Sequence, residues 1–422
     1  MKKILLFFLA SGMIFINLPQ SLNGRFSRSV YTFERFDTTG ASNTSARTYQ
    51  MLAFNFGKEN VWLRSNFNLE YDVATEMKND PRFRVYNLYA DFQKILDVAS
   101  LKLGRQPLYN SVAGGVFDGA TVGLNYSGYK LLAYYGGNVP AYQKLEIIEN
   151  WSENYLVGGE FTVYALTDWR FSAKYINKNF ASQSYTAVRL DPDLNPINVL
   201  IENQSNQYQF LTGEVSYHKQ KFVSANVRYD YDLNFQTSSR FEISGRYEAV
   251  KNLGINAYYN YREPKIRYNS IFSVFDYGNT WEIEGGVDYL IANRYTLIGK
   301  FANVTYKDEE SQRLTLGISS PYGTITARKN FGYAGEMDAI SFYTAFAQLN
   351  GLLTPSIGFS YTKYKLAEED PSNQLISVLA GTNYRPFRTL SFDIQGQYLN
   401  NKIYNNDWRL FFKLNFWFNT IF

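Results

Sequence analysis

Apolar and polar side chains alternate along nearly the whole chain, and this alternation constrains the fold more than any other feature. In residues 61–72 the apolar positions share one parity and the polar positions share the other: Val61, Leu63, Phe67, Leu69 and Tyr71 against Arg64, Asn66, Asn68, Glu70 and Asp72. Successive side chains of a β-strand point to opposite faces, so this segment predicts a strand with one apolar and one polar face. Residues 154–165 and 390–398 alternate in the same way. The sequence therefore predicts an all-β protein.

The number and length of these segments predict a closed barrel. Counting them gives about 22 strands, within a range of about 20–24, each of about 10–12 residues, which is long enough to cross a bilayer at a tilt. Short connections, such as residues 57–60 and 127–128, alternate with longer ones, such as residues 73–81, 137–151, 233–239 and 307–312. Short turns on one side and long loops on the other are typical of bacterial outer-membrane barrels, whose strand number is even. We therefore predict a closed antiparallel transmembrane β-barrel.

A secreted soluble all-β protein, either a sandwich or a solenoid, is the alternative fold. Its apolar faces would be rich in Val, Ile and Leu, whereas this chain of 422 residues contains 36 Tyr and 33 Phe. Aromatic girdles at the two membrane interfaces of a transmembrane barrel account for such rings. Because no strand edge can be left unpaired in a bilayer, a closed barrel is the arrangement that these strands favour.

The first 24 residues predict a secretory signal peptide. Lys2 and Lys3 form a positive segment, residues 4–16 are apolar, and a polar segment follows. The cleavage site is fixed only to within several residues, and the apolar segment of about 13 residues is short for a membrane anchor. Residues 25–422 then form a single barrel domain, whose first strand at residues 25–35 leaves no room for a plug domain.

The C-terminal strand resembles the closing strand of Gram-negative outer-membrane β-barrel proteins. Its apolar residues share one parity and the chain ends in an aromatic residue: Trp408, Leu410, Phe412, Leu414, Phe416, Phe418 and Phe422. In that family the terminal aromatic residue is recognised by the barrel-assembly machinery, so the resemblance implies that Phe422 is an assembly signal and that the protein resides in the bacterial outer membrane. Thr420 departs from the pattern, since the family usually carries an apolar residue there.

A second resemblance is porin-like. The segments Leu103-Gly104-Arg105-Gln106 and Phe117-Asp118-Gly119-Ala120 are similar to the strand, long loop and returning strand of porins and porin-like export channels. This resemblance covers about twenty residues and implies the porin class without implying a particular solute.

Several kinds of active site are excluded by composition. The chain has no Cys, and His218 is its single His, so thiolate and multi-His metal sites are excluded and a Ser-His-Asp triad would have to use His218. His218 lies in a predicted periplasmic turn at residues 218–221. A net charge of +4 without a basic cluster argues against a nucleic-acid partner. We therefore expect no catalytic residue, metal or cofactor, and no enzymatic activity.

Charged residues on the polar parity of the strands are predicted to line the lumen. Basic residues predominate between residues 170 and 262 and acidic ones between residues 282 and 288, but their signs nearly cancel, unlike those of a dedicated anion or cation pore. Ordinary wetting of a water-filled interior is the alternative role. The principal candidates are Arg64, Lys102, Glu160, Arg170, Lys174, Glu214, Arg228, Glu242, Arg246, Arg262, Glu282, Glu284 and Asp288, and further candidates are Glu70, Arg313, Arg328, Asp338, Asp393 and Lys413.

These predictions favour a porin-like outer-membrane channel for passive passage of small polar solutes. About 22 strands give a backbone diameter on the order of 40 Å, so loops or a partner protein must narrow the lumen. Residues 107–116 and residues 177–206, which include a predicted hairpin, are the candidate loops.

Two alternatives to a porin remain. One is a structural barrel that sheathes a periplasmic partner protein, by resemblance to porin-like proteins that enclose multihaem cytochromes in electron conduits. The other is a barrel for polysaccharide or lipid export. The remaining expected partners are outer-membrane lipid and the barrel-assembly machinery.

Overall fold

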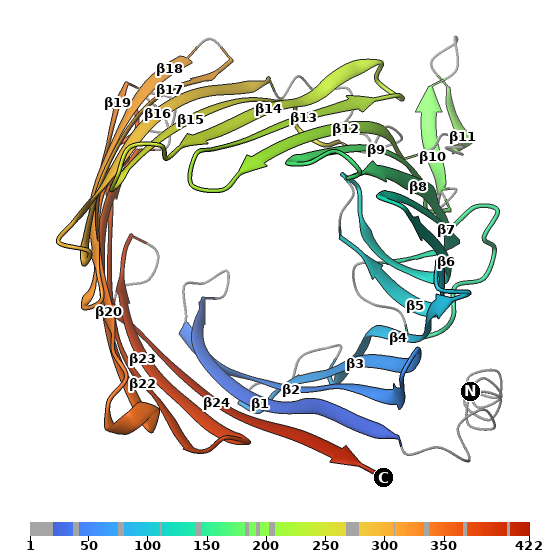
Figure 1. The fold of residues 1–422 in the computed structure, drawn as a ribbon, viewed down its shortest axis with the longest axis horizontal. Helices are drawn as coiled ribbons and strands as arrows, with labels where there is room; N and C mark the ends of the chain where they lie inside the picture. Colours follow the sequence, from blue (N-terminus) through green and yellow to red (C-terminus); the bar gives the residue numbers. More distant parts are fainter. Residues whose placement is uncertain are drawn as a thin grey trace.

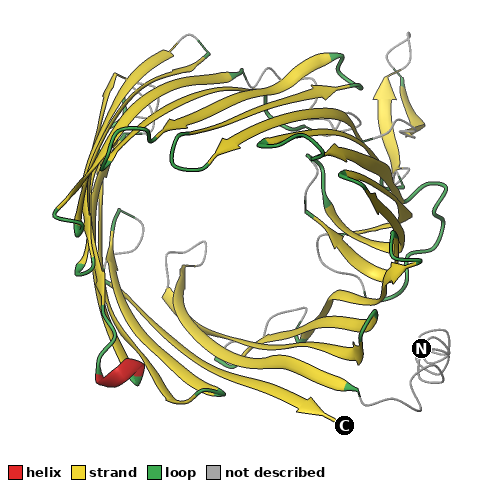
Figure 2. Cartoon of the chain, in the orientation of Figure 1, coloured by secondary structure: helices red, strands yellow, loops and turns green. Residues whose placement is uncertain are grey.

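The alternating segments form one closed antiparallel barrel in the computed structural model (Figures 1 and 2). Twenty-two strands hydrogen-bond into a single sheet, as the alternation predicts. The structure describes residues 20–36, 42–74, 80–109, 112–140, 145–181, 185–190, 195–201, 207–266, 278–307, 309–332, 337–365, 369–402 and 406–422. In this described part, no helix is long and apolar enough to cross a membrane.

The barrel strands fall into two runs separated by a long connection. The first run is β1 (Ser21–Phe36), β2 (Ser42–Lys58), β3 (Val61–Asp72), β4 (Arg82–Ile95), β5 (Ala99–Leu108), β6 (Gly115–Tyr126), β7 (Tyr129–Val139), β8 (Tyr155–Val163) and β9 (Trp169–Lys178). The second run is β12 (Tyr208–Lys219), β13 (Val223–Asp232), β14 (Thr237–Tyr247), β15 (Leu253–Arg262), β16 (Thr280–Ile291), β17 (Tyr295–Tyr306), β18 (Glu309–Ser320), β19 (Gly323–Gly332), β20 (Met337–Ala345), β21 (Leu353–Tyr364), β22 (Asn373–Phe387), β23 (Leu390–Asn400) and β24 (Asp407–Ile421). A short 3-10 turn, η3 (Leu349–Gly351), connects β20 to β21.

The first and last strands close the ring. β1 pairs with β2 on one side and with β24 on the other, with Ser21 opposite Ile421. The backbone amide of Phe422 donates to the carbonyl oxygen of Gln20 at 2.8 Å, and the amide of Gln20 donates back at 3.2 Å. Each barrel strand therefore has two neighbours, so no edge is left unpaired in the bilayer.

A separate hairpin lies between β9 and β12. Its strands β10 (Tyr185–Leu190) and β11 (Pro196–Ile201) pair only with each other, while β9 pairs directly with β12. The hairpin predicted within residues 177–206 is thus confirmed. Figure 1 shows it beyond the ring, beside β8 and β9, and not across the centre.

Short turns and longer connections alternate around most of the barrel. β1 begins and β24 ends at the short-turn side, which makes the strand number even. On the other side, only residues 233–236 separate β13 from β14, and β17 ends at Tyr306 while β18 already begins at Glu309. The longer connections expected at residues 233–239 and 307–312 are therefore wrong, because the strands continue into segments whose polar composition resembled a loop.

The outer and inner faces of the wall differ in polarity. Large apolar side chains are exposed on the outer face, among them Ile243 at 39%, Ile283 at 50%, Leu316 at 52% and Ile340 at 44%. A soluble protein rarely exposes so much apolar surface, whereas the outside of a transmembrane barrel faces lipid. The barrel therefore spans a membrane, and its even number of antiparallel strands is that of a bacterial outer-membrane protein.

The first strand begins before the predicted end of the signal peptide. Gly24 lies within β1, opposite Phe54 of β2 and Phe418 of β24. A cleavage site after residue 24 would therefore remove the first four residues of a paired strand. Residues 1–19 lie outside the described residues, so the signal peptide stays a prediction.

Candidate functional site

All thirteen principal candidates occupy the parity that faces the lumen. On β16, Glu282 and Glu284 flank Ile283, whose side chain is exposed on the outside of the barrel. The same alternation holds on the other strands, which carry Arg64, Lys102, Glu160, Arg170, Lys174, Glu214, Arg228, Glu242, Arg246, Arg262 and Asp288. Their contribution to solute passage stays a prediction.

One of the further candidates, Asp338, lies on the outer face instead. It shares the parity of Ile340, and it faces Lys329 in register. Lys329 Nζ donates to Asp338 Oδ2 at 2.9 Å. The prediction that Asp338 lines the lumen is wrong because this residue is near the loop end of β20, where the outer face leaves the hydrocarbon and tolerates charge.

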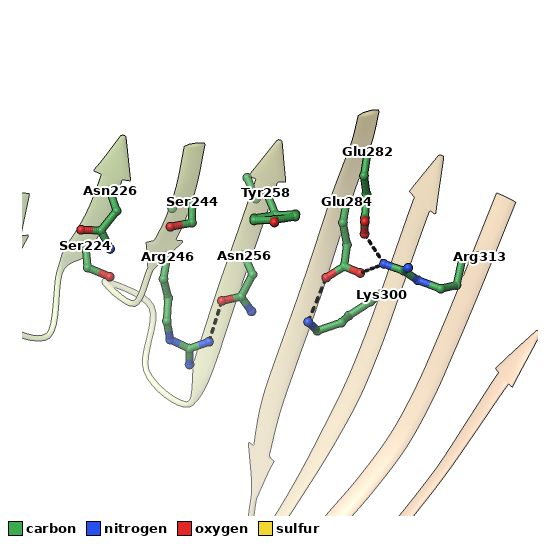
Figure 3. A pocket seen from close by; sticks show the side chains of 12 residues that line it. Ser224, Asn226, Ser244, Arg246, Asn256, Tyr258, Glu282, Glu284, Lys300 and Arg313 are labelled. Atoms are coloured by element: carbon green, nitrogen blue, oxygen red, sulfur yellow. Dashed lines mark hydrogen bonds and ion pairs between the residues drawn. The ribbon is translucent and has the colours of Figure 1, made fainter. Parts of the chain in front are cut away.

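An ion pair between Arg246 and Asp288 crosses three strands of the inner wall. Arg246 Nη1 donates to Asp288 Oδ1 at 2.6 Å and Arg246 Nη2 donates to Asp288 Oδ2 at 2.9 Å. Arg246 Nη1 also donates to Asn256 Oδ1 at 2.9 Å, on the intervening strand β15 (Figure 3). The pair passes over Gly254, where a Cβ would lie 2.4 Å from Arg246 Nη2 and 2.7 Å from Asp288 Oδ2. A glycine at this position leaves the space that the ion pair occupies.

Two bases neutralise the glutamates of β16. Lys300 Nζ donates to Glu284 Oε1 at 2.9 Å, and Arg313 Nη2 donates to Glu284 Oε2 at 2.8 Å. Arg313 also hydrogen-bonds Glu282. Figure 3 shows these side chains converging above adjacent strands. With Arg246, they line a shallow cavity of about 410 Å³ on the inner wall.

A second chain of ion pairs connects β9, β12 and β13. Glu214 accepts from Lys174 Nζ at 2.8 Å and lies 3.4 Å from Arg228 Nη1. Arg228 Nε also donates to both carboxylate oxygens of Asp230 at 3.1 Å. Asp230 is fully buried and accepts a further hydrogen bond from the hydroxyl of Thr212 at 2.6 Å. This carboxylate is thus fixed within the wall.

Several residues of these networks were missed by the sequence analysis. Asp91 on β4 accepts a hydrogen bond from Arg64 Nε at 2.8 Å, and Arg240 on β14 binds Glu242. Their positions on the polar parity were a usable signal, because a base or acid there has to face the lumen. The missed residues are Asp91, Asp230, Arg240 and Lys300.

Charge on the inner wall is neutralised locally by these pairs. The acidic segment at residues 282–288 is matched by bases on neighbouring strands, so it does not form the separate negative region that the sequence suggested. Arg262 differs in that it has a second base, Arg240, directly opposite it in register. A wall with paired charges hydrates polar solutes without strongly selecting the sign of their charge.

The connection between β5 and β6 packs against the inner wall. Lys178 Nζ donates to the carbonyl oxygen of Gly114 at 3.0 Å, and Lys265 Nζ donates to the carbonyl oxygen of Val112 at 3.0 Å. Val112 itself belongs to an apolar cluster that spans strands β5 to β12: Leu108, Val112, Phe117, Tyr134, Leu156, Ile176 and Phe210. Of the two loops expected to narrow the lumen, residues 107–116 therefore contact its wall, apart from residues 110–111, which lie outside the described residues.

His218 lies in β12 as its penultimate residue and is exposed. The prediction that His218 belongs to a turn is wrong, because β12 continues to Lys219. Within the described ranges, no group of three or more His, Asp or Glu side chains is arranged to hold a metal ion.

Comparison with known proteins finds likeness in overall structure only. No protein-family model matches the chain, and no curated protein matches its sequence. Solved structures similar to it include the translocation pore of the P pilus usher PapC, with a TM-score of 0.46 and 11% identity over 94% of this chain and 99% of that one. A BenF-like porin from Pseudomonas fluorescens has a TM-score of 0.46 and 8% identity over 95% of this chain and 99% of that one. OpdK from Pseudomonas aeruginosa has a TM-score of 0.43 and 9% identity, with the same coverage. Likenesses this weak do not place the chain in a family.

Proposed function

We propose that this protein is a wide outer-membrane channel for the passive passage of small polar solutes. The observation that carries the proposal is the inner wall, on which acids and bases from neighbouring strands form ion pairs. Paired charges keep the wall wet without creating a strong barrier to either sign of charge. Neutral and zwitterionic solutes are the class that such a wall admits most readily.

The dimensions of the ring support passage rather than tight binding. Twenty-two strands correspond to a backbone diameter on the order of 40 Å. Figure 1 shows none of the described strands crossing the centre of the ring. The apolar cluster around Val112 covers one sector of the wall, so it narrows the lumen from one side.

A second candidate function is a sheath around a partner protein. The position of β10 and β11 outside the ring favours it, because this hairpin then does not narrow the lumen. A partner inserted through the ring would close the remaining opening. Export of polysaccharide or lipid would need the same width, but no feature of the described wall favours it over the other two functions.

Measurements on the purified barrel in planar bilayers and in liposomes test the proposal. We expect stable conductance without any added protein, and liposome swelling with neutral sugars whose rate falls as sugar size increases. Swelling rates for amino acids of opposite charge and similar size should be close, because the wall charges are paired. A barrel that purifies with a bound protein, and conducts only after that protein is stripped, would instead support the sheath.

A further inference from the structure

The cavity of about 410 Å³ on the inner wall lies over two rows of residues that cross neighbouring strands. Members of each row are directly opposite one another in register, from β13 to β16. The first row is Asn226, Ser244, Tyr258 and Glu284. The second row is Ser224, Arg246, Asn256 and Gly286, with Lys300 of β17 opposite Gly286. Figure 3 shows the members of the first row in this order along the wall.

Short side chains among long ones make the wall recessed at this place. Ser224 lies opposite Arg246, and Ser244 lies opposite Tyr258. The stem of Lys300 passes over a glycine, since a Cβ at Gly286 would be 2.8 Å from Lys300 Cγ. The guanidinium of Arg246 passes over Gly254 in the same way. The long side chains therefore follow the wall, and the recess stays open to the lumen.

The charged groups around the recess are paired with one another. Three bases and three acids neutralise each other here: Arg246, Lys300 and Arg313, and Glu282, Glu284 and Asp288. Glu284 alone accepts from Lys300 Nζ at 2.9 Å and from Arg313 Nη2 at 2.8 Å. A charged or zwitterionic solute can bind these groups only by breaking an existing ion pair. An uncharged solute leaves the pairs intact, so the recess favours an uncharged solute.

The recess also offers polar side chains whose hydrogen-bonding groups are free. Within the described ranges, the side chains of Ser224, Asn226 and Ser244 make no hydrogen bond to another residue. A hydroxyl and an amide each both donate and accept. Tyr258 adds an aromatic ring, which is apolar surface beside these polar groups. Neutral donors and acceptors next to one ring complement the hydroxyls and the C–H faces of a sugar.

The width of the first row indicates the length of the solute. Asn226 and Glu284 are separated by three strand spacings, which is about 14 Å at about 4.8 Å for each spacing. A single sugar ring reaches only neighbouring members of the row. Two linked rings reach from the free groups on β13 and β14 to the ring of Tyr258 on β15. The volume of about 410 Å³ is also within the range of about 300–1,000 Å³ that is typical of small-molecule sites.

We propose that this recess binds a neutral disaccharide as it passes through the barrel. The proposal rests on the proposed channel function and names a class of solute for which the wall has a specific site. The free groups of Ser224, Asn226 and Ser244 bond the sugar hydroxyls, while the intact ion pairs disfavour charged solutes of similar size. Because the recess is open to lumen water, binding is weak and the sugar is released again, as passage through a channel requires.

Saturation-transfer-difference NMR on the full barrel, in a detergent without a sugar headgroup, tests the site with sucrose as the probe. Wild type should give a saturable signal for sucrose, a severalfold weaker affinity for glucose, and no binding of the zwitterion proline. Ser244→Phe fills the recess and should weaken sucrose binding by about tenfold, equivalent to about 1.4 kcal/mol. Ser360→Phe is the matched control, because Ser360 faces the lumen from β21, opposite Ser341, and does not line the recess.

A second pair of variants removes amides without adding bulk. Asn226→Ala should weaken sucrose binding by about fivefold, as the loss of one hydrogen bond does. Asn55→Ala, which removes an amide bonded to Asn23 elsewhere on the inner wall, should leave it unchanged. Equal sucrose affinity in wild type, Ser244→Phe and Asn226→Ala would overturn the proposal. Equal affinities for sucrose and glucose, or tighter binding of proline than of sucrose, would also overturn it.

Liposome swelling separates this site from the channel function. Ser244→Phe should still admit sucrose, because the recess occupies one sector of a much wider ring. Swelling in sucrose without sucrose binding would overturn the site and leave the channel function in place. Sucrose binding without swelling would overturn the channel function and leave the site in place.

Discussion

The guanidinium of Arg246 on β14 reaches across β15 and binds both carboxylate oxygens of Asp288 on β16, at 2.6 Å and 2.9 Å. Gly254 lies beneath this contact and leaves room for it. The pair therefore joins strands that are not hydrogen-bonded neighbours, and neutralises two charges that each face the lumen. If one member of the pair is removed, the charge of the other is no longer neutralised and acts on ions in the lumen. Arg246 and Asp288 carry opposite charges, so removing one or the other has opposite effects.

We expect single substitutions of this pair to shift ion selectivity in opposite senses. Arg246→Gln leaves the Asp288 carboxylate unpaired, so the reversal potential under a salt gradient should shift toward cations. Asp288→Asn leaves the Arg246 guanidinium in excess, so the reversal potential should shift toward anions. Both shifts should shrink at high ionic strength, because screening shortens the reach of the charge.

The double variant Arg246→Gln with Asp288→Asn is the control for this prediction. It restores local neutrality and should return the reversal potential close to that of wild type, with the strand pairing unchanged. Shifts of the same sign in both single variants would mean that the pair does not border the conducting path.

Deleting residues 185–201, the outer hairpin, should leave unit conductance unchanged. The hairpin pairs only with itself and lies beyond the ring, so its loss opens no new path through the lumen. Surface loops also tolerate deletion without loss of the scaffold. A severalfold rise in single-channel conductance after deletion would show that the hairpin folds inward in the membrane.

Removing the two lysine contacts to the β5–β6 connection should loosen it. Lys178→Met and Lys265→Met each delete a hydrogen bond to a backbone carbonyl, at Gly114 and Val112 respectively. A carbonyl that loses its partner away from water costs about 1–3 kcal/mol. In the double variant Lys178→Met with Lys265→Met, we expect increased current noise and a modest rise in unit conductance. Lys329→Met, which removes a base from the outer face, is the control and should change neither.

The alternation of the sequence was sufficient to predict the barrel, and it placed most candidate residues on the parity that faces the lumen, with Asp338 as the exception. Ile283 between Glu282 and Glu284 shows why: burial in lipid and exposure to water impose a period of two on every strand. The lumen parity of the thirteen candidates follows from the same rule. Asp91, which binds Arg64, also lies on the polar parity, although the sequence analysis did not name it as a candidate.

The ion pairs between residues far apart in the sequence could not be predicted from it, because they depend on which strands become neighbours. Arg246 and Asp288 are 42 residues apart, and only the register of β14, β15 and β16 brings them together. Arg105 and Asp118 lie on the apolar parity of their strands, where a charge contradicts the pattern. The backbone of residues 146–148 binds both charges, and these residues belong to the connection between β7 and β8. The path of a connection cannot be predicted from alternation.

The loop-side network around Asp80 should make barrel stability depend on pH. Arg47 Nη1 donates to Asp80 Oδ2 at 2.6 Å, and this hydrogen bond holds the pKa of Asp80 below its ordinary value. The stabilisation is therefore fully present above the pKa of an unfolded aspartate, about 3.9, and is lost as pH falls through the lower folded value. Asp80→Asn should reduce the free energy of unfolding by about 2 kcal/mol at pH 7 and by much less at pH 2. Denaturant unfolding at the two pH values measures this; an equal loss at both would mean that the Asp80 charge is not responsible.

Phe422 should contribute to assembly more than to the stability of the finished barrel. Its backbone amide and carbonyl close the seam with Gln20. These are backbone hydrogen bonds, so we expect them to persist in Phe422→Asp. The side chain, in contrast, is 69% exposed and so stabilises the folded barrel little. We expect Phe422→Asp to lower the fraction of chains that reach the outer membrane in folded form severalfold, while purified chains still fold in detergent.

Phe387→Asp is the matched control, because Phe387 is 66% exposed at the same short-turn end but is internal to the chain. Folded and unfolded chains in the membrane fraction are separated by their different migration in gels run with and without boiling. Equal insertion of Phe422→Asp and wild type would mean that the terminal aromatic residue is not an assembly signal, whereas an equal loss with Phe387→Asp would mean that any charge at this rim impairs insertion.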